Sequence, residues 1–188
     1  SGGYDTPDGW ARGAEREAMM IDLNCRAPVS LASALLPSMT KAGHGCILNI
    51  GSGQSFGAMP FMSTYAATKA FLLHWSEGVR AELSGTGVKM VTVCPGAITT
   101  EFNQAADIPE GDLGAISLVR GSLEDVLDAC MAAIQHNRGI SIPGFRNWIA
   151  VTIGRMSPRA ISAWVLALVL RSGAQRAAIS DRSSNDPH

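Results

Sequence analysis

Hydrophobic positions along the chain follow two different spacings. Three stretches carry apolar residues at helical intervals, and three short runs rich in apolar and β-branched residues have the character of strands. The helical stretches are residues 14–41, 63–84 and 122–136, and the strand-like runs are residues 46–50, 88–94 and 140–142. The first run is apolar on both sides, which is typical of a parallel strand covered by helices on both faces. This alternation predicts an α/β fold with a parallel sheet.

The helical stretches carry recognisable start and break signals. Ser122 and Asp125 have the spacing of a capping box, which predicts that a helix begins there and runs to about His136. Pro28 cannot donate a backbone hydrogen bond to the carbonyl of Asn24, so we expect the long helix over residues 14–41 to kink at this point. The freed carbonyl of Asn24 could then hold a water molecule.

Length, composition and charge bound the class of protein. The 188 residues are 46% hydrophobic with a formal net charge of -1, which favours one globular domain and provides no basic surface for nucleic acid. The cysteines have no paired spacing, so we expect small buried side chains in a reducing compartment rather than metal ligands. No signal peptide opens the sequence, and we expect a cytoplasmic protein.

Residues 145–171 contain two apolar helical segments, at 148–153 and 161–170. Neither approaches the roughly 20 residues that a membrane span needs. The region could form a hydrophobic cap over a substrate pocket, a subunit contact, or a membrane-surface helix flanked by arginines. We favour the first two. The polar segment over 172–188 is expected to be disordered.

Candidate chemistry lies where the strand at 46–50 leads through a small-residue turn into the helix over 63–84. Tyr65 and Lys69 are four residues apart, which places them on the same face of that helix. An ammonium beside a phenol stabilises the phenolate, so it lowers the phenol pKa from about 10 toward the range useful for proton exchange. Ser52 could donate a hydrogen bond to the oxygen on which Tyr65 acts. The pair alone is weak evidence, because both residue types are common on helix surfaces.

Four features in one order resemble the short-chain dehydrogenases/reductases. Ser52 precedes Tyr65 by thirteen residues and Lys69 follows four residues later, which is similar to the catalytic set of that family. Asn24 lies twenty-eight residues before Ser52, similar to the family's active-site asparagine. The segment from Pro95 to Thr100 resembles the family's Pro-Gly-x-Ile-x-Thr loop. The resemblance covers residues 24 to about 144.

The resemblance implies an NAD(P)-dependent oxidoreductase that transfers hydride between a nicotinamide and a carbonyl or alcohol carbon. In such an enzyme Ser52 would orient the substrate oxygen, Tyr65 would exchange its proton, and Lys69 would hold the ribose and lower the tyrosine pKa. Asn24 would support the proton relay through its backbone. No metal site is implied. The implied cofactor-binding residues are Tyr65, Lys69, Pro95, Gly96, Ile98 and Thr100.

The glycines around Ser52 allow a second interpretation, a phosphate-binding loop. Gly51, Gly53 and Gly57 mimic a dinucleotide fingerprint, but that fingerprint needs a glycine where Phe56 stands. The next strand also ends without the acidic residue that such a fold requires. We therefore expect these glycines to allow close approach of the chain around Ser52 instead.

The family's first strand and its Thr-Gly-x-x-x-Gly-x-Gly loop have no counterpart in this sequence. The resemblance therefore implies an incomplete Rossmann-like, doubly wound parallel sheet, with about three of seven strands, followed by apolar C-terminal helices. We assign residues 1–144 to the catalytic portion, 145–171 to a helical extension and 172–188 to a polar tail. The strand at 46–50 would then form an apolar edge, which is open to pairing.

Two functional hypotheses follow. The chain carries the catalytic part of a short-chain dehydrogenase, or it is a truncated, inactive fragment that acts as a binding or oligomerisation module. Either NAD or NADP fits, because the residue that selects between them would lie in the missing half. We expect a hydrophobic ketone or alcohol substrate, a specificity-setting lid over residues 101–121, and a homo-oligomer formed through helices 14–41 and 63–84.

Overall fold

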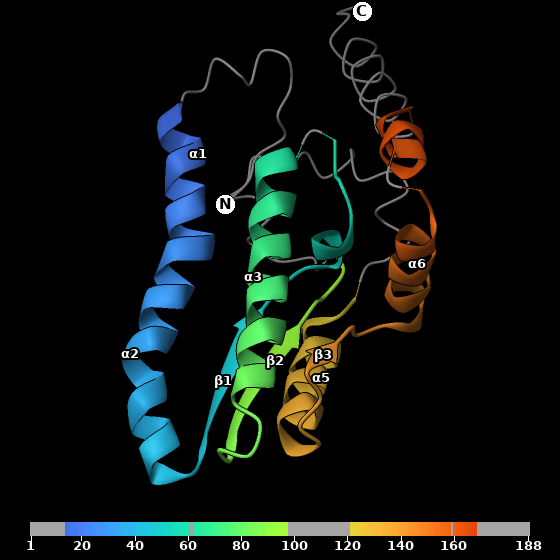
Figure 1. The fold of residues 1–188 in the computed structure, drawn as a ribbon. Coiled ribbons are helices and arrows are strands. Elements are labelled where there is room, and N and C mark those ends of the chain that lie inside the picture. The colour runs from blue at the N-terminus through green and yellow to red at the C-terminus, as the bar shows by residue number, and fades with distance from the viewer. Residues whose placement is uncertain (1–13, 61, 98–120, 159, 169–188) are drawn as a thin grey trace, which may run out of the picture.

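The computed structural model describes residues 14–60, 62–97, 121–158 and 160–168 of the chain (Figure 1). In chain order the elements are α1 (Ala14–Ile21), the π-helical turn η2 (Asp22–Arg26), α2 (Ala27–Ala42), β1 (Gly45–Ile50), the 3-10 turn η3 (Gly53–Phe56), α3 (Ser63–Glu82), β2 (Val88–Val93), α5 (Leu123–Gln135), β3 (Ile140–Ser141) and α6 (Phe145–Met156). Residues 160–168 are also helical. The helices and strands predicted up to residue 142 are all present, which confirms the element order that the hydrophobic pattern predicted.

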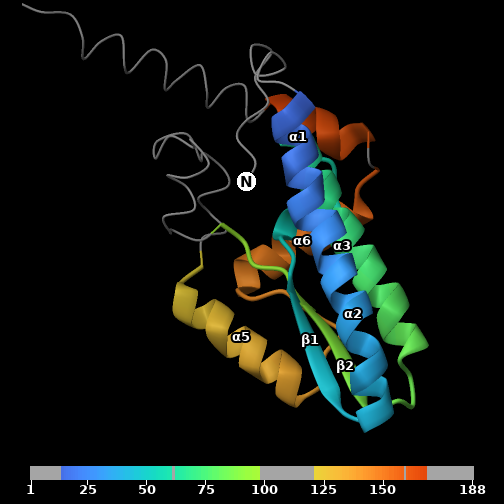
Figure 2. The same ribbon diagram turned by 90° about the vertical axis from the view of Figure 1, so that its left-hand side faces the viewer.

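The strands form one parallel sheet in the order β1-β2-β3. Gly45 to Ile50 pair in register with Val88 to Val93, and the short β3 pairs with the end of β2. Helices α1, α2 and α3 lie on one face of the sheet and α5 lies on the other (Figure 2). Helices on both faces of a parallel sheet are the α/β arrangement that the sequence predicted.

The central strand β2 is the centre of the core. Its side chains Val91 and Val93 are inaccessible to solvent and pack with buried residues of α5. From the opposite face α3 contributes Leu72 and Leu73, which are also buried. Full burial of a side chain of this size contributes about 1.5–3 kcal/mol to folding. The end of β2 is therefore packed on both faces, and this packing holds the start of the following turn in place.

Within the described residues β1 pairs with β2 alone and so forms an edge of the sheet. Ile50 at its carboxyl end is 46% exposed, whereas its register partner Val93 is inaccessible. The apolar edge that the sequence predicted is therefore present in this structure. Backbone donors and acceptors along such an edge can pair with a further strand.

The long first helix changes its hydrogen-bonding pattern close to the position where Pro28 predicted a kink. Residues Asp22 to Arg26 form a π-helical turn, in which the N–H of Ala27 donates to the carbonyl of Asp22 five residues earlier. A π turn accommodates the missing N–H of Pro28 without ending the helix, and such turns are frequent at functional sites. The helix then continues through Pro37 to Ala42.

The C-terminal helix α6 is longer than the sequence predicted, because it spans Phe145 to Met156 rather than residues 148–153. It packs on η3, and the Arg155 guanidinium lies 5.4 Å from the centre of the Phe56 ring. Among the described residues, no helix has the length and hydropathy of a membrane span. The same residues contain no cluster of histidine, cysteine and acidic side chains suited to a metal ion.

The predicted capping box at the start of α5 is confirmed. The Asp125 N–H donates to Ser122 Oγ at 3.0 Å, and the Ser122 N–H donates to Asp125 Oδ2 at 3.3 Å. Because a helix start leaves backbone N–H groups without intrahelical partners, these two bonds stabilise it locally. The start of α5 is thus encoded by its own four residues.

Candidate active site

Two loops meet beyond the carboxyl ends of β1 and β2, where open α/β sheets bind ligands. The Gly51 N–H donates to the Val93 carbonyl at 2.7 Å, and the Gly53 N–H donates to the Pro95 carbonyl at 2.8 Å. The two loops are therefore joined by backbone hydrogen bonds on both sides of Ser52. This arrangement brings Ser52 next to the Pro95 turn.

The Ser52 loop is held closely by its own side chains and by its glycines. Ser52 caps η3: its Oγ accepts from the Gln54 N–H at 3.2 Å, and its own N–H donates to Ser55 Oγ at 3.2 Å. A Cβ atom at Gly51 would lie 2.7 Å from Cys94 Sγ, which is closer than side chains normally approach. A Cβ atom at Gly53 would be equally crowded. The prediction of close approach is confirmed for Gly51 and Gly53, but it is wrong for Gly57, where an added Cβ atom would meet nothing within 4 Å.

Helix α3 brings Tyr65 and Lys69 to the same place. Lys69 Nζ lies 5.8 Å from the centre of the Tyr65 ring and donates a hydrogen bond to the Ile50 carbonyl at 2.9 Å. The Ser52 side chain lies within hydrogen-bonding reach of the Tyr65 phenol and favours its ionised form. The structure therefore assembles a serine hydroxyl, a phenol and an ammonium within one small volume at the end of β1.

Burial decides the titration of this cluster. Desolvation raises the pKa of Tyr65, and the hydrogen bond with Ser52 opposes the rise without cancelling it. Desolvation also disfavours the charged form of Lys69, and it therefore lowers the pKa of that ammonium. The sequence predicted that Lys69 would lower the Tyr65 pKa, and for this structure that direction is wrong. The reason is that burial removes more solvation free energy from the phenolate than its polar neighbours supply in its place.

Asn24 reaches the cluster indirectly. Its side-chain Nδ2 donates to Thr68 Oγ1 at 3.1 Å, and that hydroxyl donates to the Tyr65 carbonyl at 2.8 Å. Asn24 lies in the π-helical turn η2, which contacts α3. The carboxamide thus ties the first helix to the turn of α3 that carries the tyrosine.

The turn after β2 is only partly described. Pro95 is buried and Gly96 is half-buried beside the Ser52 loop, whereas Ile98, Thr100 and the predicted lid over 101–121 fall almost entirely outside the described residues. Two buried residues at this turn were not singled out from the sequence as members of the site. Cys94, under Ser52, has a pKa raised to about 11 by burial, and Asn147 donates to the Cys94 carbonyl. Neither residue belongs to a local motif that could have revealed it.

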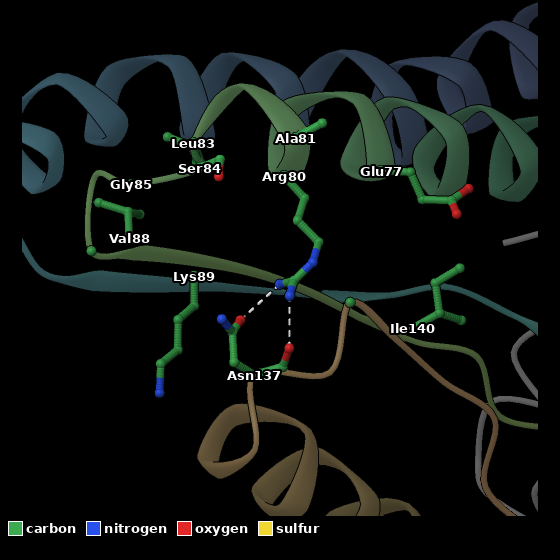
Figure 3. A pocket seen from close by; sticks show the side chains of 12 residues that line it. Glu77, Arg80, Ala81, Leu83, Ser84, Gly85, Val88, Lys89, Asn137 and Ile140 are labelled. Atoms are coloured by element: carbon green, nitrogen blue, oxygen red, sulfur yellow. Dashed lines mark hydrogen bonds between the residues drawn. The ribbon is translucent and has the colours of Figure 1, made fainter.

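A hollow with a volume of about 840 Å³ lies at the opposite end of the sheet from Ser52 and Tyr65 (Figure 3). Arg80 donates there to the side-chain and backbone oxygens of Asn137, both at 2.7 Å, and to the Met90 carbonyl at 3.0 Å. Lys89 donates to the carbonyl of Ile134 in the last turn of α5. Cations at a helix C-terminus offset its exposed carbonyls, so these two side chains stabilise the fold and form no catalytic set.

Comparisons with known proteins agree with the geometry. The family model of the short-chain dehydrogenases matches residues 13–110. A ketoacyl reductase, HetN, of Nostoc is 41% identical over 80 residues, which are 43% of this chain and 28% of the relative. Dehydrogenase/reductase SDR family member 7B of the rat is 30% identical over 145 residues, which are 74% of this chain and 45% of the relative. The chain thus spans less than half the length of these relatives.

A solved structure shows the same arrangement of helices and strands. A short-chain dehydrogenase from Sphingobium yanoikuyae in complex with NADPH superposes with a TM-score of 0.67 and 31% identity, over 82% of this chain and 60% of that chain. A 7beta-hydroxysteroid dehydrogenase shares the fold with a TM-score of 0.70. The family match, the parallel sheet and the residues gathered at its carboxyl end lead to one conclusion: this chain belongs to the short-chain dehydrogenase family.

Proposed function

We propose that the chain carries the catalytic end of an NAD(P)-dependent oxidoreductase that interconverts a carbonyl group and an alcohol. The observation that carries the proposal is the gathering of three side chains at the carboxyl end of β1. Lys69 Nζ lies 5.8 Å from the centre of the Tyr65 ring and is bonded to the Ile50 carbonyl, and Ser52 acts on the same phenol. Two hydroxyl groups that meet in this way can both contact one substrate oxygen. Such a pair is suited to move a proton to or from that oxygen as its bonding changes.

Each side chain then has a distinct role. Ser52 orients the substrate oxygen, since its hydroxyl is fixed by the cap of η3. Tyr65 gives its proton to the carbonyl oxygen during reduction. Lys69 lies beside the ring, and Asn24 supports the relay from the π-helical turn η2. A raised phenol pKa keeps Tyr65 protonated at neutral pH, which favours the reductive direction.

The described residues fit the nicotinamide end of the cofactor. When bound, NADH or NADPH supplies the hydride. An ammonium has three donors, and one of those on Lys69 is used by the Ile50 carbonyl, which leaves capacity for ribose hydroxyls. Pro95 and Gly96 line the same end of the sheet, and we extend the proposed cofactor contacts to Ile98 and Thr100. The bound NADPH of the Sphingobium yanoikuyae relative supports this class of cofactor.

We propose a hydrophobic ketone or alcohol as the substrate. Helix α6 packs on η3 directly after Ser52, and its apolar side chains Ile153 and Met156 are exposed. An apolar wall beside the reacting oxygen lowers the free energy of a bound hydrophobic substrate. A preference for small polar alcohols over lipophilic ones would contradict this substrate class.

Titration with NADPH and NADH tests the function directly. Energy transfer from the protein's four tryptophans to the nicotinamide reports binding, and Lys69→Met serves as the matched variant. We expect saturable binding that Lys69→Met weakens, followed by oxidation of the cofactor when a panel of aryl ketones is added. Absence of both binding and turnover would contradict the proposal.

The alternative function, a binding module, is favoured by one observation. The apolar edge strand β1 pairs on one side only within the described residues, and an open edge can accept a strand from another chain. A chain that binds no nicotinamide cofactor yet forms a stoichiometric complex through β1 would support this alternative. The Gly51 N–H donates to β2, so alternate residues of β1, Leu48 among them, direct their N–H groups to the open side. Substitution of Leu48 by proline, which removes a backbone donor from that open side, should then abolish the complex.

A further inference from the structure

Asn147 lies at the start of α6, far in sequence from the candidate catalytic residues, yet it is buried among the loops that hold them. Its side chain is 5% exposed, although asparagine is mostly found at protein surfaces. The Nδ2 group donates to the carbonyls of Cys94 and Pro143, each at 3.2 Å. Because both N–H groups of the buried carboxamide donate hydrogen bonds, the carboxamide is held in one orientation.

The oxygen of the same carboxamide packs against the Ser52 loop. A Cβ atom at Gly53 would lie 2.8 Å from Asn147 Oδ1. Gly53 also donates its N–H to the Pro95 carbonyl at 2.8 Å. These contacts close a ring: the nitrogen of Asn147 holds the carbonyl before Pro95, its oxygen lies against Gly53, and Gly53 is bonded to Pro95.

We propose that Asn147 is a positioning residue whose carboxamide sets the spacing between the Ser52 loop and the Pro95 turn, and thereby the contact of Ser52 with Tyr65. The inference rests on the proposed function, in which Ser52 and Tyr65 act on one substrate oxygen. Asn147 acts through Gly53. Because a misplacement of about 1 Å can cost about a hundredfold in rate, even a small shift of this loop has a measurable effect.

A purely structural role makes a different prediction. If Asn147 did no more than satisfy the carbonyls of Cys94 and Pro143, its removal would lower the stability and leave the Ser52–Tyr65 contact intact. A hydrogen bond with Ser52 lowers the pKa of Tyr65, so a displaced Ser52 loop raises that pKa. The titration of Tyr65 therefore separates the two roles.

The test uses Asn147→Ala in the full chain with Tyr4→Phe, which leaves Tyr65 as the remaining one of the chain's two tyrosines. Tyrosinate absorbance is followed against pH, with circular dichroism recorded at each point to confirm the fold. We expect an upward shift of the midpoint relative to Tyr4→Phe alone. An unshifted midpoint in a folded Asn147→Ala variant would overturn the proposal.

The control is a second buried asparagine. Asn49 donates to Ser76 Oγ at 2.9 Å within the packing of β1 against α3. Asn49→Ala should lower the unfolding temperature and leave the Tyr65 midpoint unchanged. An equal shift in both variants would mean that the midpoint reports general loosening, and it would also overturn the proposal.

Two further variants keep the test decisive if Asn147→Ala does not fold. Asn147→Asp retains the shape but loses the donor, and Gly53→Ala presses a methyl group onto Asn147 Oδ1. Both should raise the Tyr65 midpoint. In the double variant Gly53→Ala, Asn147→Ala the crowding is relieved, so the shift should be smaller than the sum of the two single shifts. An unshifted midpoint in Gly53→Ala decides against the proposal by itself.

The titration needs neither cofactor nor substrate, so it separates this inference from the proposed function. In an active chain Asn147→Ala should also lower kcat by about tenfold to a hundredfold with KM little changed. A shifted midpoint in a chain with no reductase activity supports the positioning role and contradicts the proposed function. An unshifted midpoint in an active chain contradicts the positioning role alone.

Discussion

The two helical segments that carry candidate residues lie side by side on one face of the sheet, but they are held differently (Figures 1 and 2). Helix α3 buries five of its twenty residues, and Leu73 among them is 2% exposed. Helix α2 buries Ala32 alone. Its outer side exposes Leu31 and Leu35, the former at 64%.

This difference explains how the candidate chemistry is distributed. Tyr65 and Lys69, which need a fixed geometry, lie on the embedded helix α3. Asn24 lies in η2, within the outer helix that α1, η2 and α2 form together, and it reaches α3 through the hydroxyl of Thr68. Helix α3 is thus the scaffold of the candidate site, whereas the outer helix supports it and presents an apolar surface to solvent or to a second chain.

The largest expected effect is that of Tyr65→Phe on turnover. Loss of the phenol proton should lower kcat by about 10²–10⁴-fold, the usual contribution of general acid catalysis. Asn24→Ala on the outer helix should cost roughly twofold to tenfold, since it removes one hydrogen bond worth about 0.5–1.5 kcal/mol. Steady-state reduction of the most responsive aryl ketone measures both.

Unchanged circular dichroism is the control for these two variants. If Asn24→Ala were as damaging as Tyr65→Phe, the outer helix would take part in the chemistry on equal terms and the comparison would fail.

Stability provides the next contrast, between Leu73→Ala and Leu31→Ala. A buried leucine leaves a cavity, so Leu73→Ala should lower the free energy of unfolding by about 2–5 kcal/mol. Leu31→Ala at the exposed position should change it by less than about 0.5 kcal/mol. Urea denaturation measures both. A similar loss at the two positions would indicate that α2 is covered by other parts of the protein.

The buried thiol of Cys94 gives the stability a pH dependence. Its pKa is 9.0 as a free group and about 11 in the fold, so between these values the folded state keeps a proton that the unfolded state loses. Stability is therefore highest below pH 9 and falls as the pH rises toward 11, by about 2–3 kcal/mol. The stability difference between the parent and Cys94→Ala should shrink by that amount.

Cys25 on the outer helix is the matched control for Cys94. Burial also raises its pKa, but the residue is half-exposed, so Cys25→Ala should alter the pH dependence less. Urea denaturation at several alkaline pH values tests this order, and a larger effect for Cys25 would contradict it.

The smallest expected effect on the isolated subunit is that of Leu31→Glu. We propose that a second copy of the chain covers the apolar side of α2 that this structure leaves exposed. A charge at Leu31 should then separate the subunits while changing the stability of each subunit by less than about 0.5 kcal/mol. Light scattering after size-exclusion chromatography measures the mass. Leu127→Glu on α5, at a leucine 56% exposed on the opposite face, is the control. A parent that is already monomeric would end this interpretation.

Much of the local structure followed from spacing along the chain. The capping box of Ser122 and Asp125 and the shared face of Tyr65 and Lys69 each depend on residues a few positions apart. The order of strands and helices followed in the same way, because backbone periodicity is visible in the hydrophobic pattern. Pro28 predicted where the long helix is disturbed, but it did not predict that the disturbance is a π turn.

Tertiary structure alone decided the environment of those residues. The raised pKa of Tyr65 depends on burial, the hydrogen bond of Lys69 to the Ile50 carbonyl joins α3 to the end of β1, and Asn147 meets Cys94 from 53 positions away. Local patterns determine which backbone an amino-acid segment prefers. Desolvation and contacts between distant segments exist only once the chain has packed, and for that reason they determine how the candidate site titrates and what holds it in place.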